Sequence, residues 1–138
     1  MKDRMSIILF SGTVDRLFAV ATLATGGVAM GLDVDIFLTF WGLNAFRKDQ
    51  VRTNQRFSAD FAEFAEPALQ AMQAKSVPHW LDTLRAAQEI GHVRVLACSM
   101  TMQLFGWTLE ELDPIVSEVA GVATFVEEAR DSRITLFI

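Results

Sequence analysis

Cys98 is the only cysteine of the chain, and its type and position suit covalent chemistry. It lies between an apolar run, 93–97, and a helix-like segment, 99–105, so we expect it at a strand-to-helix junction. Backbone N–H groups at a helix start stabilise anions, and the thiolate is the nucleophilic form of cysteine. The alternative role is that of a small buried hydrophobe, which cysteine often fills. Position alone favours this inert role, so the surroundings of Cys98 must decide.

Alternating strand and helix patterns are the elements that must position the thiol. Short apolar runs rich in β-branched residues predict strands, and apolar residues at helical spacing predict helices. This alternation is typical of a three-layer α/β fold with a mostly parallel sheet. The predicted strands are 5–10, 34–40, 93–98, 115–119 and 134–138, and the predicted helices are 14–30, 61–72, 78–91, 99–105 and 120–129.

Several residues are expected to begin, end or constrain these helices. Thr13 can cap the first helix, Gly106 can end the helix after Cys98, and 108–111 matches a capping box. Gly26 and Gly27 lie inside the first helix, where each costs about 1 kcal/mol relative to alanine. We expect close packing on the sheet or on a neighbouring subunit as the compensation.

The segment 47–58 is basic in an otherwise acidic chain, because four cations there face only Asp49. A solvated loop is favoured over an anion-binding flap for this segment. The helical pattern that follows has Ser58 as its expected cap and Pro67 inside it, so we expect a kink or a split at the proline. The four cations are Arg47, Lys48, Arg52 and Arg56.

Composition bounds the class of protein. A length of 138 residues suits one α/β domain, 1–138. With 51% hydrophobic residues and a mean hydropathy of +0.30, the chain is more apolar than most soluble domains, so we expect a homo-oligomer. The net charge of -5 argues against a nucleic-acid partner. A single cysteine excludes an internal disulfide, a four-cysteine zinc site and a CxxC pair.

Targeting and membrane segments are not predicted. The apolar run 5–10 is too short for the core of a signal peptide. The uncharged stretch 17–32 contains three glycines and falls short of the roughly 20 residues that span a bilayer. We therefore expect a buried helix and a cytoplasmic protein, and a membrane-associated role is the less favoured alternative.

Common cofactor and catalytic motifs are missing from the sequence. There is neither a Walker loop nor a GxGxxG fingerprint, and His79 and His92 have no partner at metal-ligand spacing. We expect no cofactor and no metal, with His79 at a helix start and His92 in a turn. A papain-like pair with Cys98 has no local support, and a thiol peroxidase is disfavoured because Val95 stands where peroxiredoxins carry threonine.

Three loops should meet at the carboxyl edge of the sheet, where ligands bind in open α/β folds. These are 11–12, 41–44 and the residues around Cys98, with aromatic cover from Phe40, Trp41 and Trp107. A thiolate with no adjacent base suits a carrier that holds sulfane sulfur as a persulfide and yields it to another thiol. Both exchanging thiols must then belong to other chains. The expected pocket residues are Ser11, Gly12, Trp41, Gly42, Asn44, Ser99, Met100 and Thr101.

Segments at these positions resemble the DsrE/DsrF/DsrH-like family of small sulfur-transfer proteins. The likeness is carried by 7–12, by 31–44 with Phe-Trp-Gly at 40–42, and by 96–106 with Ala-Cys-x-Met-x-Met at 97–102. With 120–124 and the last strand, it covers nearly the whole chain except about 47–77. The Phe-Trp-Gly and Ala-Cys-x-Met-x-Met segments are fairly specific in combination.

This resemblance implies a flavodoxin-like fold with a five-stranded sheet, assembled as homo-oligomers or hetero-oligomers. It also implies a cytoplasmic sulfur carrier or sulfurtransferase in which Cys98 carries a persulfide or a thiosulfate-derived group. The implied partners are TusA-like or rhodanese-like sulfur carriers in sulfur oxidation or sulfur relay. The alternative is a non-catalytic small-ligand-binding or structural subunit of a DsrE-type oligomer, with an unreactive Cys98.

Overall fold

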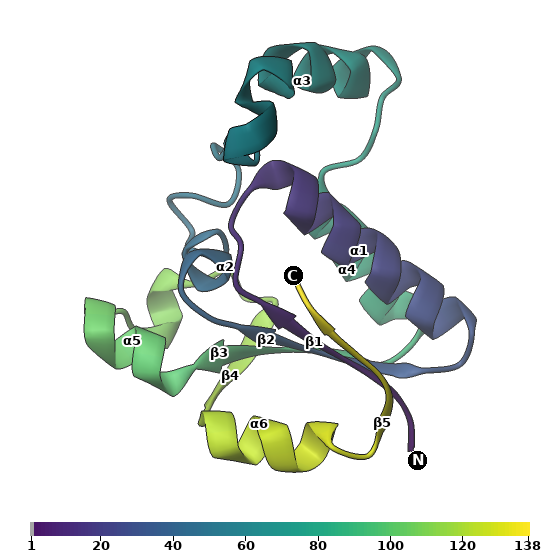
Figure 1. Cartoon of the computed structure of the whole chain (residues 1–138), viewed down its shortest axis with the longest axis vertical. Coiled ribbons are helices and arrows are strands. Elements are labelled where there is room, and N and C mark those ends of the chain that lie inside the picture. Colours follow the sequence, from purple (N-terminus) through teal and green to yellow (C-terminus); the bar gives the residue numbers. More distant parts are fainter. Residues whose placement is uncertain (1) are drawn as a thin grey trace.

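Five parallel strands form one sheet in the computed structural model of the chain, which describes residues 2–138. The strand order is β4-β3-β2-β1-β5, so β1, the first strand in the sequence, lies between β2 and β5 (Figure 1). The expected three-layer α/β fold is thereby confirmed, with a sheet that is parallel throughout. The strands are β1 (Lys2–Leu9), β2 (Asp33–Leu38), β3 (Val93–Cys98), β4 (Val116–Ala120) and β5 (Ser132–Phe137).

Helices cover the two faces of the sheet unequally (Figure 1). The long α1 and α4 pack on one face, and the short α6 packs on the other. The smaller α2 and α5 lie near the carboxyl ends of the strands. The helices are α1 (Val14–Ala29), α2 (Trp41–Asn44), α3 (Ala65–Ala74), α4 (Trp80–Ile90), α5 (Ser99–Phe105) and α6 (Val122–Ala129), and the 3₁₀ helices are η1 (Ala59–Phe64) and η2 (Leu109–Glu111).

Side-chain alternation along the strands divides the core into two clusters. In β3, Val95 points to the cluster under α1 and α4, whereas Leu96 and Cys98 point to the cluster under α6. In β2, Phe37 joins the α6 side, where its ring stacks on Phe125 with centroids 4.7 Å apart. The thiol therefore lies on the face of the sheet that α6 covers.

The ends of the helices and strands agree in part with the ends predicted from the sequence. The capping box at 108–111 forms at η2, and Gly106 ends α5 with a φ of +69°. Thr13 stands at the start of α1 but makes no capping hydrogen bond, because its hydroxyl pairs with Ser11. Residues 41–44 form the helical turn α2, not an open turn. The strands β1 and β5 begin earlier than predicted, at Lys2 and Ser132.

The paired glycines of α1 behave differently. A Cβ on Gly27 would lie 2.9 Å from Cγ2 of Val34, whereas a Cβ on Gly26 would meet nothing within 4 Å. Close packing on the sheet is therefore confirmed for Gly27 but not for Gly26. Within residues 2–138, α1 and the other helices all lack the length or the apolar character needed to cross a bilayer.

The arm, which we define as residues 59–74, stands away from the rest of the molecule (Figure 1). It consists of η1 and α3, and it contains no buried residue. The break expected at Pro67 is not present, because α3 runs from Ala65 to Ala74 through the proline, which lies in its first turn, where a missing N–H costs no helical hydrogen bond. Ser58 does not cap this segment, because its backbone N–H and its hydroxyl donate to Asp15 instead.

Candidate functional site

Cys98 ends β3 and precedes the first turn of α5, as the sequence predicts. The apolar strand stops there because 99–105 turns into a helix that Gly106 terminates. The cysteine is only 3% exposed, and it packs with Phe37, Leu96 and Phe125 under α6. A thiol in this position is shielded from bulk solvent.

Polar groups nevertheless surround the sulfur. Burial would raise the pKa of the Cys98 thiol, but hydrogen bonds from the Thr101 backbone, the Thr101 and Thr39 hydroxyls and the Met100 backbone outweigh it and lower the pKa. Hydrogen bonds to the charged form stabilise that form. The site therefore favours the thiolate, the form that attacks sulfur.

The hydroxyls of Thr39 and Thr101 form a partly buried pair beside the thiol. Their oxygens are 3.1 Å apart, and Thr101 is fully buried. The backbone N–H of Phe40 donates to Oγ1 of Thr101 over 3.2 Å, so this oxygen acts as an acceptor. The two hydroxyl hydrogens are thus shared between this pair and the sulfur.

Phe40 has an unusual backbone conformation at this point. Its φ is +49° and its ψ is -116°, a region that costs a non-glycine residue on the order of 1–3 kcal/mol. This conformation aims the Phe40 N–H at Thr101 while the chain turns from β2 into α2. The backbone strain thus lies in the loop between β2 and α2, at the residue that contacts Thr101.

The three loops at the carboxyl edge converge, as predicted. The N–H of Gly42 donates to the Phe10 carbonyl over 2.8 Å, which joins the end of β1 to α2. A Cβ on Gly12 would lie 2.3 Å from the Trp41 carbonyl oxygen, and one on Gly42 would lie 2.2 Å from that of Leu9. Both glycines are required because no side chain fits between these backbones.

The predicted pocket residues separate into two groups. One group lines a cavity of about 360 Å³ near the start of α1, and Cys98 is not among its lining residues. Ser99, Met100 and Thr101 instead form the first turn of α5 next to the thiol, and Met100 is 53% exposed. The cavity is lined by Ser11, Gly12, Thr13, Trp41, Asn44 and Arg56, whereas Gly42 is buried and is not among its lining residues.

Thr39, which lies beside the thiol, and Arg56, which lines the cavity, were not predicted as site residues. Thr39 follows Leu38, whose partner in β3 is Ala97, so continuing the parallel register places Thr39 beside Cys98. This signal was available once the two strands were paired. Arg56 lines the cavity, although the sequence indicated only that it belongs to a basic segment.

Aromatic rings cover the carboxyl edge of the sheet. The expected cover residues Phe40 and Trp41 have ring centroids 5.9 Å apart, and each lies 6.0 Å from Phe105. The Trp107 ring stacks on Phe105 with centroids 4.8 Å apart, and the Phe10 ring lies 5.6 Å from Phe40. Trp41 is 51% exposed, so this cluster forms an apolar surface beside the cavity.

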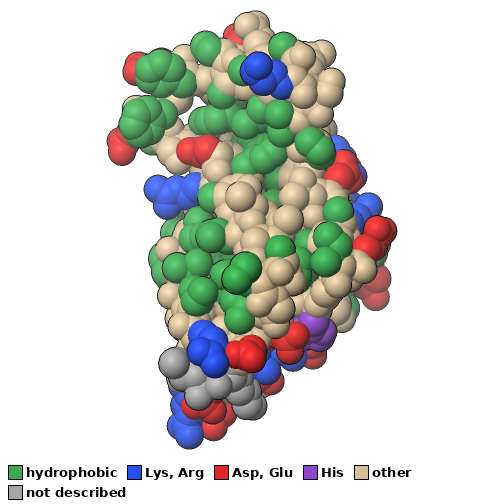
Figure 2. Space-filling model, turned by 90° about the vertical axis from the view of Figure 1, so that its right-hand side faces the viewer, with side chains coloured by type: hydrophobic (Ala, Val, Ile, Leu, Met, Phe, Trp, Pro, Cys, Tyr) green, Lys and Arg blue, Asp and Glu red, His purple; other side chains and the backbone are tan. Residues whose placement is uncertain are grey.

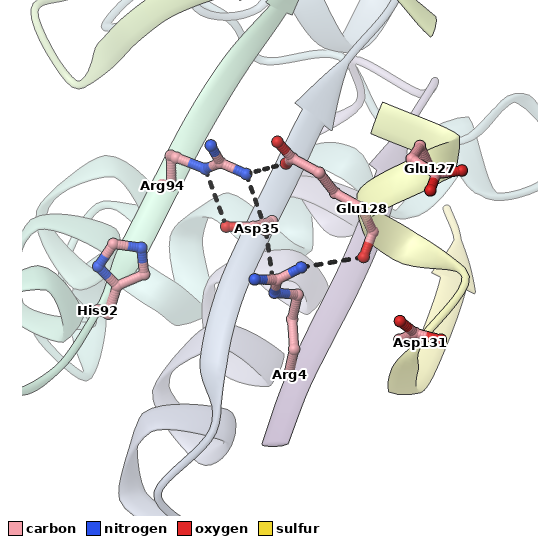
Figure 3. A pocket seen from close by; sticks show the side chains of 7 residues that line it. All are labelled: Arg4, Asp35, His92, Arg94, Glu127, Glu128 and Asp131. Carbon is pink, nitrogen blue, oxygen red and sulfur yellow. Dashed lines mark hydrogen bonds and ion pairs between the residues drawn. The ribbon is translucent and has the colours of Figure 1, made fainter. Parts of the chain in front are cut away.

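A second, highly charged cavity of about 440 Å³ lies on the α6 face, around residues that precede Phe37 and Leu96 in their strands (Figure 3). Asp35 is 2% exposed and accepts two hydrogen bonds from Arg94, each 3.1 Å long. Arg94 also pairs with Glu128, whose carbonyl accepts from Arg4 over 2.9 Å. Carboxylates thus neutralise both guanidinium groups, and the network fastens α6 to three strands (Figure 3).

The histidines and the carboxylates do not build a metal centre in the part of the chain that the structure describes. No three His, Cys, Asp or Glu side chains gather there in a way that could hold a metal ion. His79 caps α4, because its Nδ1 accepts from the N–H of Leu81 over 3.1 Å. Its predicted position at a helix start is confirmed.

Comparison with known proteins gives similar chains over nearly the whole length. An uncharacterized protein of Bacillus subtilis, YrkE, is 33% identical, with 98% of this chain and 96% of that protein covered. The sulfur carrier protein DsrE2 of Allochromatium vinosum is 28% identical, with 99% of each chain covered.

A solved structure has the same fold. It is that of MTH1491, a protein of unknown function from Methanobacterium thermoautotrophicum, with a TM-score of 0.57 and 16% identity over 96% of this chain and 97% of that one. The model of the DsrE/DsrF/DrsH-like family matches residues 1–137. The resemblance carried by the residues around Phe40 and Cys98 is therefore confirmed, and the chain belongs to the DsrE/DsrF/DrsH-like family.

Proposed function

We propose that the chain is a sulfur carrier in which Cys98 accepts sulfane sulfur and passes it to a partner thiol. The observation that carries this proposal is the place of the Cys98 thiol at the start of α5, beside the Thr39 and Thr101 hydroxyls, where hydrogen bonds lower its pKa. Family membership and the similarity to a protein named as a sulfur carrier support a role in sulfur relay. A stabilised thiolate is both an attacking group and a good leaving group, and a carrier needs both properties.

The transfer conserves electrons and needs no redox partner. The Cys98 thiolate attacks the outer sulfur of a donor persulfide, a new S–S bond forms, and the donor leaves as a thiolate. Cys98 then carries the persulfide, with the proton on its outer sulfur. An acceptor thiolate attacks that outer sulfur, and the Cys98 thiolate departs. With a polythionate donor, the same attack places a thiosulfate-derived group on Cys98 and releases thiosulfate or a related anion.

Donor and acceptor belong to other chains, because Cys98 is the only cysteine. In this proposal they are TusA-like or rhodanese-like carriers in the cytoplasm. The residues of the cavity near α1, namely Ser11, Gly12, Trp41 and Asn44, do not surround the thiol. We therefore assign them to binding of the donor or partner, and Ser99, Met100 and Thr101 to the transferred group.

Mass spectrometry tests the proposal directly. Protein treated with polysulfide or tetrathionate should gain one adduct, located on Cys98, and a thiol partner should then remove it. Cys98→Ser is a clean control because it leaves no thiol in the chain. Absence of any adduct on the wild-type protein, with behaviour identical to that of Cys98→Ser, would refute a carrier role.

A non-catalytic subunit is the second candidate, and the near-complete burial of Cys98 favours it. This candidate predicts that the thiol does not react. The rate of iodoacetamide alkylation against pH separates the two, because a carrier shows an inflection well below the pKa of a free thiol, about 8.5. A thiol that stays unreactive up to high pH would support the subunit.

A further inference from the structure

The arm lacks the packing that its helices need. Isolated helices shorter than roughly 12–15 residues are marginal in water, and most helical stability in proteins comes from tertiary packing. The α3 helix has 10 residues and η1 has six, and neither contains a buried residue. Contacts outside the protomer are the expected source of the missing stabilisation.

One side of the arm faces its own protomer. Leu69 and Met72 line a cavity of about 230 Å³ together with Phe18 and Trp80, which belong to α1 and α4. A cavity thus separates this side of the arm from α1 and α4. The inner side of the arm thus faces its own protomer, whereas its outer side faces solvent.

The outer side presents two aromatic rings. Phe61 and Phe64 are 58% and 53% exposed, and their ring centroids are 6.2 Å apart. Hydrophobic side chains gather over the arm at the top of the molecule, with acidic side chains beside them (Figure 2). Clustered exposed aromatic residues are typical anchors of protein interfaces.

The charged residues of the arm indicate which surface complements its outer side. Glu63 and Glu66 lie on the arm, and neither has a cation within 4 Å among the residues that the structure describes. Arg16 and Arg56 flank the start of α1, and neither has a carboxylate within 4 Å in the same range. They line adjoining cavities that share Ser11, Thr13 and Trp41.

We propose that the outer side of the arm docks on the Arg16–Arg56 surface of a second copy of this chain. The arm and this basic surface adjoin in one protomer, since Ala59 and Asp60 line a cavity with Arg16. A two-fold axis therefore lets each copy place its arm on the other, which satisfies both contacts at once. Phe61 and Phe64 then meet exposed aromatic surface, because Trp41 borders both basic cavities.

The assembly follows from the arm alone and is independent of the chemistry of Cys98. It has a consequence for the carboxyl edge of the sheet, where Trp41 and Phe10 would be covered by the neighbour's arm. The second copy then forms one wall of the approach to the cavity near α1.

Complementary charge reversal tests the proposal. Two double variants are needed, Glu63→Lys with Glu66→Lys and Arg16→Glu with Arg56→Glu, and light scattering after gel filtration gives the mass of each. The wild-type protein should be dimeric at low salt, and each double variant should be monomeric. An equimolar mixture of the two variants should recover the dimer, since every arm again faces an opposite charge.

A matched control reverses two exposed acids elsewhere, Glu89→Lys with Glu110→Lys, and should leave the dimer intact. Circular dichroism confirms that all variants keep their helices. A monomeric wild-type protein would overturn the proposal, and so would an oligomer whose mass does not change in either double variant. Labelling of Cys98 by polysulfide is measured separately, so its failure would bear on the carrier function and not on the arm.

Discussion

Replacing Gly42 by alanine is the sharpest perturbation that the structure offers at the candidate site. Gly42 is buried where α2 passes the end of β1, and its N–H donates to the carbonyl oxygens of Phe10 and Thr39. Its φ is not in the left-handed region, so the requirement for glycine is one of space. An added Cβ would lie 2.2 Å from the carbonyl oxygen of Leu9.

The size of the effect follows from this distance. Ordinary contact begins at 3.4 Å, so the two backbones must separate by about 1.2 Å. That shift breaks the 2.8 Å bond from Gly42 to Phe10. Because the Gly42 N–H keeps its 3.1 Å bond to the Thr39 carbonyl, losing the bond to Phe10 costs about 0.5–1.5 kcal/mol, and overpacking adds about 1–3 kcal/mol. We expect a loss of about 1.5–4.5 kcal/mol in the free energy of unfolding, which lowers the melting temperature by about 6–18 °C.

Thermal unfolding followed by circular dichroism measures this change, with Gly26→Ala as the matched control. Gly26 has the same substitution in open space, and alanine is the better helix former by about 1 kcal/mol. The control should therefore melt at a slightly higher temperature than the wild-type protein. If Gly42→Ala melted at the wild-type temperature, the tight contact of α2 with β1 would be wrong.

Two further predictions concern titratable groups. Thr101→Val removes a hydroxyl beside the thiol, so the inflection of Cys98 alkylation should move to higher pH, and Thr101→Ser should restore it; equal profiles for all three proteins would exclude a role for the hydroxyl pair. For Asp15, burial alone would raise the pKa, but hydrogen bonds from Thr13 and Ser58 outweigh it and lower the pKa relative to the unfolded chain, where it is about 3.9. Its stabilising contribution is therefore present above that pH and is lost as the pH falls through the folded-state pKa. Asp15→Asn should destabilise the protein near pH 7, with a difference that shrinks in acid, and a pH-independent difference in denaturant titrations would contradict this.

The strand pattern and the meeting of loops could be predicted from the sequence because they depend on local periodicity and on one topological rule. Apolar runs such as 93–97 have few other stable arrangements in a chain of this length. Parallel strands bring their carboxyl ends to one edge, which places Gly12 beside Trp41, and Thr39 and Phe40 beside Thr101. These inferences do not depend on where any helix finally packs.

The sequence could not predict that the site divides into two parts, the surroundings of Cys98 and the cavity near α1. The side of the sheet that Cys98 faces follows from its alternation with Leu96, but the helix that covers this side is settled only by tertiary packing. The hydroxyl of Thr39 went unrecognised because the strand was predicted to continue through Phe40, whereas β2 ends at Leu38. The strained φ of Phe40 has no local sequence signal, since phenylalanine rarely adopts it.

The place of β1 in the sheet has a consequence for synthesis of the chain. β1 is the first strand to be made, and its partner β5 is the last of the five. During translation one edge of β1, with its apolar residues Ile7, Ile8 and Leu9, therefore stays unpaired until β5 has left the ribosome. Until then, this edge is a template on which other chains can pair and aggregate.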